Sequence, residues 1–357
     1  MSNTSMDLAE RLRAAGITVN TGASSEPENP WYVKALLALS AWVASLFLLV
    51  AVGAAFADLF DSRLALTISG LLLIGAAVLL LTRWRNDFND NFGLALSLAG
   101  QVLLVFAINK NLEPDMALYW WAVCVFQSGL LVLPHFVHRL VVAAFGGVAF
   151  ALALIASGLA HFAGSLLIVL LALVWLAEFS SLRHMRLCQA LGFGWAIALL
   201  CVQYIRRWQL AEFEDVFGVQ GSGWAWLAEA LTIAVLVKLI LVVVRQSHVI
   251  VRPGQWAFIA VFIVCLSAAS WYAYGLLQAV ILLLLAFYGR NRVLFGLACV
   301  SLLLALSSYY YLLDTTLLIK SMTLLLLGLL LLGARALFCY LWPSTKGDDA
   351  RALEVEP

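Results

Sequence analysis

Three ionisable side chains interrupt long apolar stretches of this sequence. Glu229 and Lys238 lie in the stretch 224–244, and Lys320 lies in the stretch 315–338. Carrying a charge into a bilayer is costly, so such residues are the first candidates for binding or transport. Glu229 and Lys320 each lie about five residues, or roughly 7–8 Å along a helix, from the predicted outer end of their stretch. Because they share a depth, the two side chains could form an ion pair or line an outward-facing cavity.

Two further candidates accompany this pair. Lys238 lies nine residues after Glu229, which at 100° per residue brings it to the opposite face of the helix. Its long stem favours snorkelling, in which the ammonium reaches the interface through lipid, and the same alternative stays open for Lys320. Asp314 adds a carboxylate at the outer end, six residues before Lys320. The predicted binding site therefore consists of Glu229 and Lys320, with Lys238 and Asp314 as further candidates.

Other residue types argue against several kinds of chemistry. All five histidines lie in loops or at helix ends, so no mid-span pair could ligate a haem. His135 and His138 are three residues apart, a spacing that one metal ion can bridge. A third ligand would be His184 or Glu178, but interfacial polar side chains explain these residues better. The sequence has no P-loop, no HExxH and no GxSxG, so we expect no metal and no cofactor.

Carboxylates also gather in the longest predicted outer loop, 206–223. Glu212, Glu214 and Asp215 lie there and support an alternative function, an integral enzyme that uses a carboxylate as acid or base on lipid-linked substrates. A scaffold subunit without any site is a third alternative. Glutamines in the middle of predicted spans are interpreted as hydrogen-bonding contacts between helices. These are Gln101, Gln127, Gln203 and Gln278.

The elements that must position these residues follow from the composition. Of the 357 residues, 64% are hydrophobic and 11% are charged, whereas about 25% of an ordinary soluble domain is charged. Apolar stretches of about 20 residues can cross a bilayer. We therefore predict an all-α polytopic membrane helix bundle in contact with lipid, and we exclude a nucleic-acid binder, a secreted disulfide scaffold and a β-barrel. About twelve spans are expected, at 33–57, 63–82, 91–109, 117–133, 139–157, 162–179, 188–205, 224–244, 256–271, 274–289, 293–312 and 315–338.

Charge decides the orientation of these spans, because Lys and Arg concentrate in cytoplasmic loops. When the region 256–289 forms two spans and both termini are cytoplasmic, 15 of the 21 Lys and Arg residues lie inside. We therefore expect a protein of the bacterial inner membrane with both ends in the cytoplasm. Its predicted parts are a short cytoplasmic helix and linker at 1–31, a transmembrane domain at 32–342 and a disordered tail at 343–357.

A tetrapeptide recurs at nearly constant spacing. Phe92-Gly93-Leu94-Ala95 returns as Phe193-Gly194-Trp195-Ala196 and as Phe295-Gly296-Leu297-Ala298. This pattern predicts three tandem four-helix units, 33–133, 139–244 and 256–338, in which the glycine lets helices approach closely. Coincidence is the alternative, since Phe, Gly and Ala are abundant here.

Two segments carry a resemblance to a known family. The string YYYLLDTTLLIKS at 309–321 precedes the helix MTLLLLGLLLL, and the chain starts with LAERLRAAG and PWYVKALLALSAWVASLFLL. Together they resemble bacterial membrane proteins grouped as domain of unknown function 4401, over residues 8 to about 338. The resemblance implies no activity. It gives Lys320 more weight, and it implies a second, periplasm-facing membrane protein as a partner, because members of such families are often encoded beside one.

These patterns together favour one function over the alternatives. We predict an uncharacterised, non-enzymatic multi-pass membrane protein that binds or translocates a small solute or lipid. Its binding site would be the polar site in the outer half of the bundle.

Overall fold

The computed structural model describes eight continuous stretches of the chain. These are residues 62–83, 87–112, 115–133, 135–177, 185–208, 224–247, 252–272 and 275–312, together with single positions within 33–51 and 318–336. The chain divides into two compact units, Met1–Leu104 and Val105–Pro357, and the boundary falls inside a helix.

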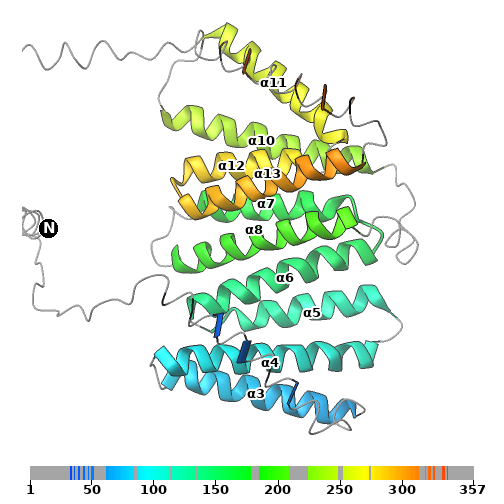
Figure 1. Ribbon diagram of the computed structural model, residues 1–357, viewed down its shortest axis with the longest axis vertical. Helices are drawn as coiled ribbons and strands as arrows, with labels where there is room; N and C mark the ends of the chain where they lie inside the picture. Colours follow the sequence, from blue (N-terminus) through cyan, green and yellow to red (C-terminus); the bar gives the residue numbers. More distant parts are fainter. Residues whose placement is uncertain are drawn as a thin grey trace, which may run out of the picture. The chain divides into compact units, whose positions relative to one another are not determined.

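The secondary structure of these residues is α-helical, and no strand occurs among them (Figure 1). Leucine and alanine favour helices, and a helix satisfies its backbone polar groups internally, as an apolar environment requires. The described part of the chain forms ten helices: α3 Arg63–Arg83, α4 Asp87–Leu112, α5 Met116–Leu130, α6 Phe136–Ala156, α7 Phe162–Ala177, α8 Met185–Trp208, α10 Ala225–Ser247, α11 Pro253–Tyr272, α12 Leu276–Tyr288 and α13 Arg292–Leu312.

These helices coincide with ten of the predicted spans to within four residues at each end. The region 256–289 forms two helices, α11 and α12, as the charge distribution predicts. The predicted spans 33–57 and 315–338 lie outside the described residues apart from single helical positions. The described helices therefore do not support a total of twelve, and that count stays a prediction. The predicted N-terminal helix and C-terminal tail also lie outside the described residues.

Six of the described helices are long and apolar enough to cross a membrane, namely α3, α4, α6, α8, α10 and α11. Large apolar side chains are exposed along their surfaces, for example Leu72 and Val261. Exposed apolar faces of this kind fit contact with lipid, so the fold fits a multi-pass membrane protein. Helix α12 has only 13 residues and is about 20 Å long, which is shorter than the roughly 30 Å hydrocarbon layer.

In the first unit, α3 packs against the first part of α4 through glycines. A Cβ placed on Gly100 would lie 2.8 Å from the carbonyl oxygen of Gly70, closer than any side chain tolerates. A Cβ on Gly93 would lie 3.1 Å from the side chain of Leu81. Small residues thus let the two helix backbones touch, as is common between membrane helices.

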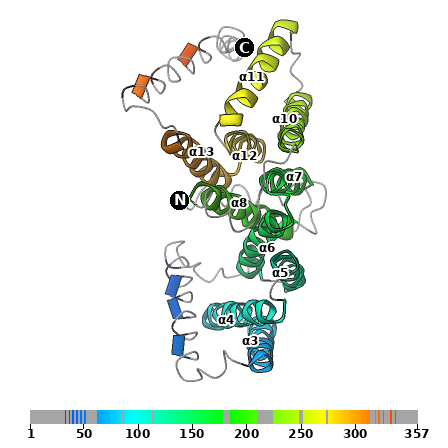
Figure 2. The ribbon, with the colours of Figure 1, turned by 90° about the vertical axis from the view of Figure 1, so that its right-hand side faces the viewer.

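In the second unit, α12 is the central helix. Figure 2, which shows most helices end-on, places it among α7, α10, α11 and α13, and it contacts all four. Its side chains form the middle of the largest apolar core, where Leu277, Ile281 and Leu285 are almost fully buried. The shortest described helix therefore lies at the centre of the largest apolar core.

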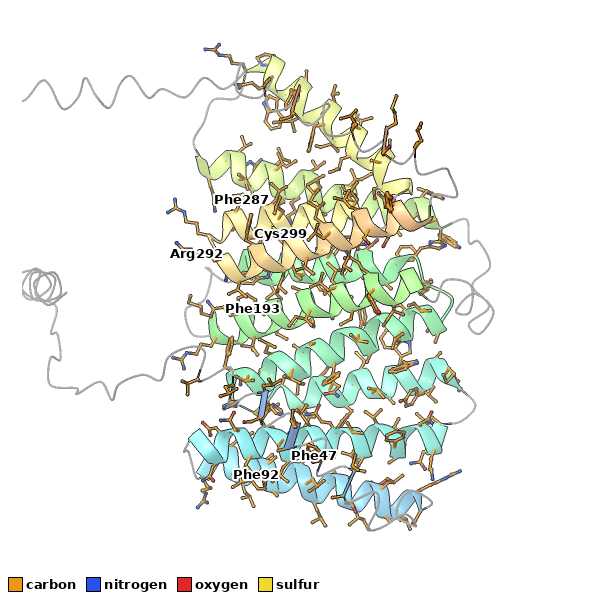
Figure 3. All side chains as sticks on the ribbon, viewed as in Figure 1. Phe47, Phe92, Phe193, Phe287, Arg292 and Cys299 are labelled. Atoms are coloured by element: carbon orange, nitrogen blue, oxygen red, sulfur yellow. The ribbon has the colours of Figure 1, made fainter. Side chains whose placement is uncertain are left out.

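One end of the second unit collects arginines. Trp175, near the end of α7, packs against Gly192 near the start of α8 and lies 4.0 Å from a Cβ placed on Gly289 after α12. These contacts bring the end of α12 and the starts of α8 and α13 together, and Figure 3 shows Phe193 and Arg292 at this same end. We call it the arginine end, after Arg139, Arg186, Arg245, Arg252, Arg290 and Arg292.

The described packing does not support three tandem units. Gly194 is buried, and a Cβ there would lie 2.6 Å from the carbonyl oxygen of Leu140. Gly296, its counterpart in the third copy, is exposed and a Cβ there would meet nothing within 4 Å. The close helix approach that would explain the repeat is therefore missing at the third copy.

These two glycines make a matched test of the packing. Gly194→Ala should lower the free energy of unfolding by about 1–3 kcal/mol, because the new methyl group overpacks the α6–α8 contact. Gly296→Ala should be neutral or raise it by about 0.5–1 kcal/mol, because alanine favours the helix and meets no neighbour. Thermal unfolding of the detergent-solubilised protein measures both. Equal losses in the two variants would contradict the packing described here and would revive the three-unit interpretation.

Candidate functional site

Helix α12 begins inside the bundle rather than at its surface. Its N-cap is Gly275, which is buried, has a φ of 87° and receives no side-chain capping hydrogen bond. A side chain at this position would be strained, because L residues rarely adopt positive φ. A Cβ there would also lie 2.8 Å from Nε2 of Gln203. Glycine is therefore required where α12 starts, and it lets Gln203 of α8 reach the backbone.

Gln203 is the centre of a buried hydrogen-bond network that joins three helices. Its Nε2 donates to the carbonyl oxygen of Gly275 at 3.4 Å and to Oε1 of Gln278 in α12 at 3.3 Å. The hydroxyl of Ser301 in α13 donates to its Oε1 at 2.9 Å. All three side chains are buried. We call this set the glutamine network; it links α8, α12 and α13.

A second buried polar contact joins α7 and α10. The hydroxyl oxygens of Ser165 and Thr232 lie 3.0 Å apart, and Thr232 Oγ1 also lies 3.0 Å from the carbonyl oxygen of Ala228. A hydroxyl has one proton and two lone pairs. Thr232 therefore donates its one proton either to the Ser165 hydroxyl or to the Ala228 carbonyl. We call Ser165 and Thr232 the hydroxyl pair.

Glu229 lies beside this pair on α10. Positions three residues apart are neighbours on a helix surface, so Glu229 adjoins Thr232. The Oε1 atom of Glu229 is buried, and it has no hydrogen-bond partner among the residues that the structure describes. A buried polar atom without a partner is rare in native proteins and calls for an explanation. This carboxylate oxygen therefore differs from the glutamine network and the hydroxyl pair, whose hydrogen bonds are made within the protein.

The depth of these groups follows from a contact at the arginine end. Nε2 of Gln246 in α10 donates to the hydroxyl of Tyr288 in α12 at 2.9 Å, so the two helices are level there. Helix α12 begins twelve residues earlier, about 18 Å away, and the same distance along α10 leads to about residue 234. Thr232 is thus near the level at which α12 starts, and Glu229 lies about one turn beyond it. The glutamine network and the hydroxyl pair lie towards the end opposite the arginines.

The other predicted site residues do not join this region within the described chain. Lys238 is exposed on α10, so it does not line the buried polar region. Lys320 and Asp314 lie outside the described residues, as do Glu212, Glu214 and Asp215 of the predicted outer loop. The proposed pairing of Glu229 with Lys320 therefore stays a prediction.

Sequence reasoning missed three members of the polar region: Ser165, Thr232 and Ser301. Serine and threonine in helices often bond to their own backbone, so their spacing gives no signal of contacts to other helices. The prediction for Gln203 and Gln278 as contacts between helices is correct. Gln101 instead donates to Ser97 one turn earlier in its own helix, at 3.0 Å.

One described histidine, His135, has a structural role. Nδ1 of His135 accepts a hydrogen bond from the backbone N–H of His138 at 3.3 Å and so caps the start of α6. The third ligands considered from the sequence, His184 and Glu178, lie outside the described residues. Within the described part of the chain, no group of three His, Cys, Asp or Glu residues could hold a metal ion.

Comparison with known proteins gives one match. The family model described as Domain of unknown function (DUF4401) matches residues 30–341. No curated protein and no solved structure matches the chain.

Substitutions in the glutamine network should lower stability more when they leave more polar groups without a partner. Ser301→Ala removes one donor and should cost about 1 kcal/mol. Gln203→Leu leaves both Gln278 and Ser301 unpaired and should cost about 1–3 kcal/mol. Thermal unfolding in detergent measures these losses, with Gln246→Leu as a control because its hydrogen bond is exposed.

A triple variant distinguishes the cost of unpaired polar groups from the cost of lost packing. Gln203→Leu combined with Gln278→Leu and Ser301→Ala removes every side-chain partner of the network. It should be more stable than Gln203→Leu alone, because no buried polar side chain of the network then lacks a partner. Strictly additive losses in the triple variant would contradict a coupled network.

Proposed function

We propose that this chain, which belongs to the family described as Domain of unknown function (DUF4401), binds or translocates a small solute or a lipid through a polar site in one half of its helix bundle. The site comprises Glu229 and the hydroxyl pair on α7 and α10. The glutamine network holds the start of α12 beside them. In this role the protein is a binding or transport protein rather than an enzyme.

One observation carries the proposal: Oε1 of Glu229 is buried and lacks a partner among the described residues. An ionisable group inside a membrane helix costs several times what a neutral polar group costs. A sequence that keeps one without an internal partner is retaining it for something other than stability. Binding a ligand is the role that compensates this cost, because the ligand supplies the missing hydrogen bond.

The short helix α12 supports the same proposal. Many secondary transporters bind substrate where a helix starts or stops within the membrane, because the end of such a helix presents backbone groups and a partial charge. Helix α12 has 13 residues and a buried N-terminus. The positively polarised end of α12 lies about one turn from the level of Glu229, so both signs of charge are available to one ligand.

Lys320 and Asp314 are proposed as further members of the site from outside the described residues. Lys320 would stand at the same depth as Glu229 if the stretch 315–338 crosses the membrane. Lys238 is proposed to snorkel towards the arginine end, which agrees with its exposure.

The proposal also includes an orientation of the protein in the membrane. Lys and Arg favour the cytoplasmic side of membrane proteins, so the arginine end would face the cytoplasm. Glu229 would then lie in the outer half of the bundle, and both termini would be cytoplasmic. A bacterial inner membrane is the proposed location, and a partner with a periplasmic domain would meet the end opposite the arginines.

The main test replaces the candidate carboxylate. Glu229→Gln keeps the size of the side chain and removes its charge, and it should abolish complementation of a deletion strain while the amount of protein in the membrane stays normal. Lys320→Met should have the same effect if Lys320 belongs to the site. Lys238→Met is the matched control on the same helix and should complement fully.

The alternative enzyme is tested by the predicted outer loop. Replacing Glu212, Glu214 and Asp215 together by their amides should leave complementation intact under the binding proposal. Loss of complementation by this variant, with normal activity of Glu229→Gln, would favour the enzyme. Full complementation by every variant would favour the third alternative, a scaffold subunit without a binding or catalytic site.

Accessibility to a membrane-impermeant maleimide tests the orientation. A cysteine at Leu159, which is exposed between α6 and α7, should react in intact spheroplasts. A cysteine at Arg292 of the arginine end should react only after the membrane is permeabilised. The parent protein measures the background of the native cysteines, and the opposite pattern would invert the proposed topology.

A further inference from the structure

We infer that the ligand group which Glu229 binds is an ammonium group, carried either by a free amine or by a lipid headgroup such as that of phosphatidylethanolamine. This inference rests on the proposed function and names the ligand class of the same site. It starts from Oε1 of Glu229, a buried carboxylate oxygen that has no hydrogen-bond partner among the described residues.

The protein's own described cations do not reach Glu229. On α10, Lys238 is exposed and lies nine residues further on, on the opposite face of the helix, and Arg245 is exposed at the arginine end, sixteen residues after Glu229. Helices α7 and α12, which pack against α10, contain no Lys, Arg, Asp or Glu. The cation that pairs with this carboxylate must therefore come from a ligand or from outside the described chain.

The remaining titratable groups around α10 are few. His161 directly precedes α7 at the end of the bundle where Glu229 lies, and it already takes part in another interaction. Tyr288 of α12 is bound to Gln246 at the arginine end, and Cys265 of α11 is exposed. None of these supplies a permanent positive charge.

The donor and acceptor inventory selects an ammonium among the cations. A divalent metal ion needs several anionic or carbonyl oxygens, and no group of three metal-ligating side chains occurs among the described residues. A guanidinium prefers both oxygens of a carboxylate in a planar fork, whereas the acceptors here are the buried Oε1 of Glu229 and two hydroxyls. An ammonium has three donors around a point charge. It can bond to Oε1 and to a hydroxyl of the adjoining Ser165–Thr232 pair.

The two hydroxyls are suited to this second role. Thr232 Oγ1 can donate to the Ser165 hydroxyl or to the Ala228 carbonyl, each 3.0 Å away. In either arrangement the two hydroxyl oxygens retain lone pairs that can accept a hydrogen bond from an ammonium. The surroundings of Glu229 thus offer a negative charge with neutral acceptors, which are complementary to a cationic donor.

Ligand-induced stabilisation of the full-length protein in detergent tests this assignment. A ligand that binds only the folded state raises the unfolding temperature as its concentration increases. Ethanolamine represents the free amine, phosphatidylethanolamine the lipid, and phosphatidylglycerol and inorganic phosphate are the controls without an ammonium. We expect ethanolamine, phosphatidylethanolamine or both to raise the unfolding temperature of the wild-type protein, and the arm that does so identifies the source.

The variants decide whether Glu229 is responsible. Glu229→Gln should lose the response, and Glu229→Asp should retain part of it, because the charge remains. Stabilisation by the amines that persists in Glu229→Gln would overturn the inference. So would stabilisation by the controls alone, although a polar binding site, and hence the proposed function, would survive that result.

A further variant tests whether the protein supplies its own ammonium. If Lys320 already pairs with Glu229, the wild-type protein should not respond and Lys320→Met should respond to ethanolamine. That outcome would overturn the inference for the native protein and retain the site. No response in any variant, together with full complementation by Glu229→Gln, would overturn both the inference and the proposed function.

Discussion

The organisation of the second unit depends on how the buried start of α12 is held in place. A helix has four unbonded N–H groups at its start, and backbone polar groups inside a membrane cannot rely on water. Most membrane helices avoid the problem by starting at the interface. Helix α12 is too short for that and begins at Gly275, in buried surroundings. The glutamine network donates to the carbonyl oxygen of Gly275 and does not cap the N–H groups, so its role is to hold the buried start of α12 in place.

This requirement explains the choice of residues on the neighbouring helices. Gly275 must lack a side chain so that Gln203 can approach, and the amide of Gln203 must both donate to α12 and accept from Ser301. An amide does both at once, because its NH2 group donates while its oxygen accepts. Around this point the packing is apolar, with Leu277 and Ile281 almost fully buried. The polar groups consequently fix the depth and rotation of α12, because hydrogen bonds are directional. The leucines supply apolar contact area, which is not directional.

The sequence predicts the helices well because their signal is long and repeated. Ten stretches of apolar residues became ten helices, and the balance of arginines was enough to divide 256–289 into two. The tetrapeptide repeat was a weaker signal, because a glycine allows two helices to approach closely but does not require it. Gly194 uses that freedom and Gly296 does not. Contacts between helices depend on which faces meet, and that information is not present in the order of residues along one helix.

The same limit applies to the candidate site. Glu229 could be singled out from the sequence, because a carboxylate within an apolar stretch is rare, but Ser165 and Thr232 could not. The structure then adds a distinction that the sequence lacks. The buried amides and hydroxyls that join α7, α8, α10, α12 and α13 have hydrogen-bond partners in the protein, and Oε1 of Glu229 has none among the described residues. Groups that serve folding are expected to be paired internally, since pairing is what makes their burial tolerable. A carboxylate oxygen left unpaired in the same part of the bundle as these two networks is the reason why we propose a partner from outside the described chain.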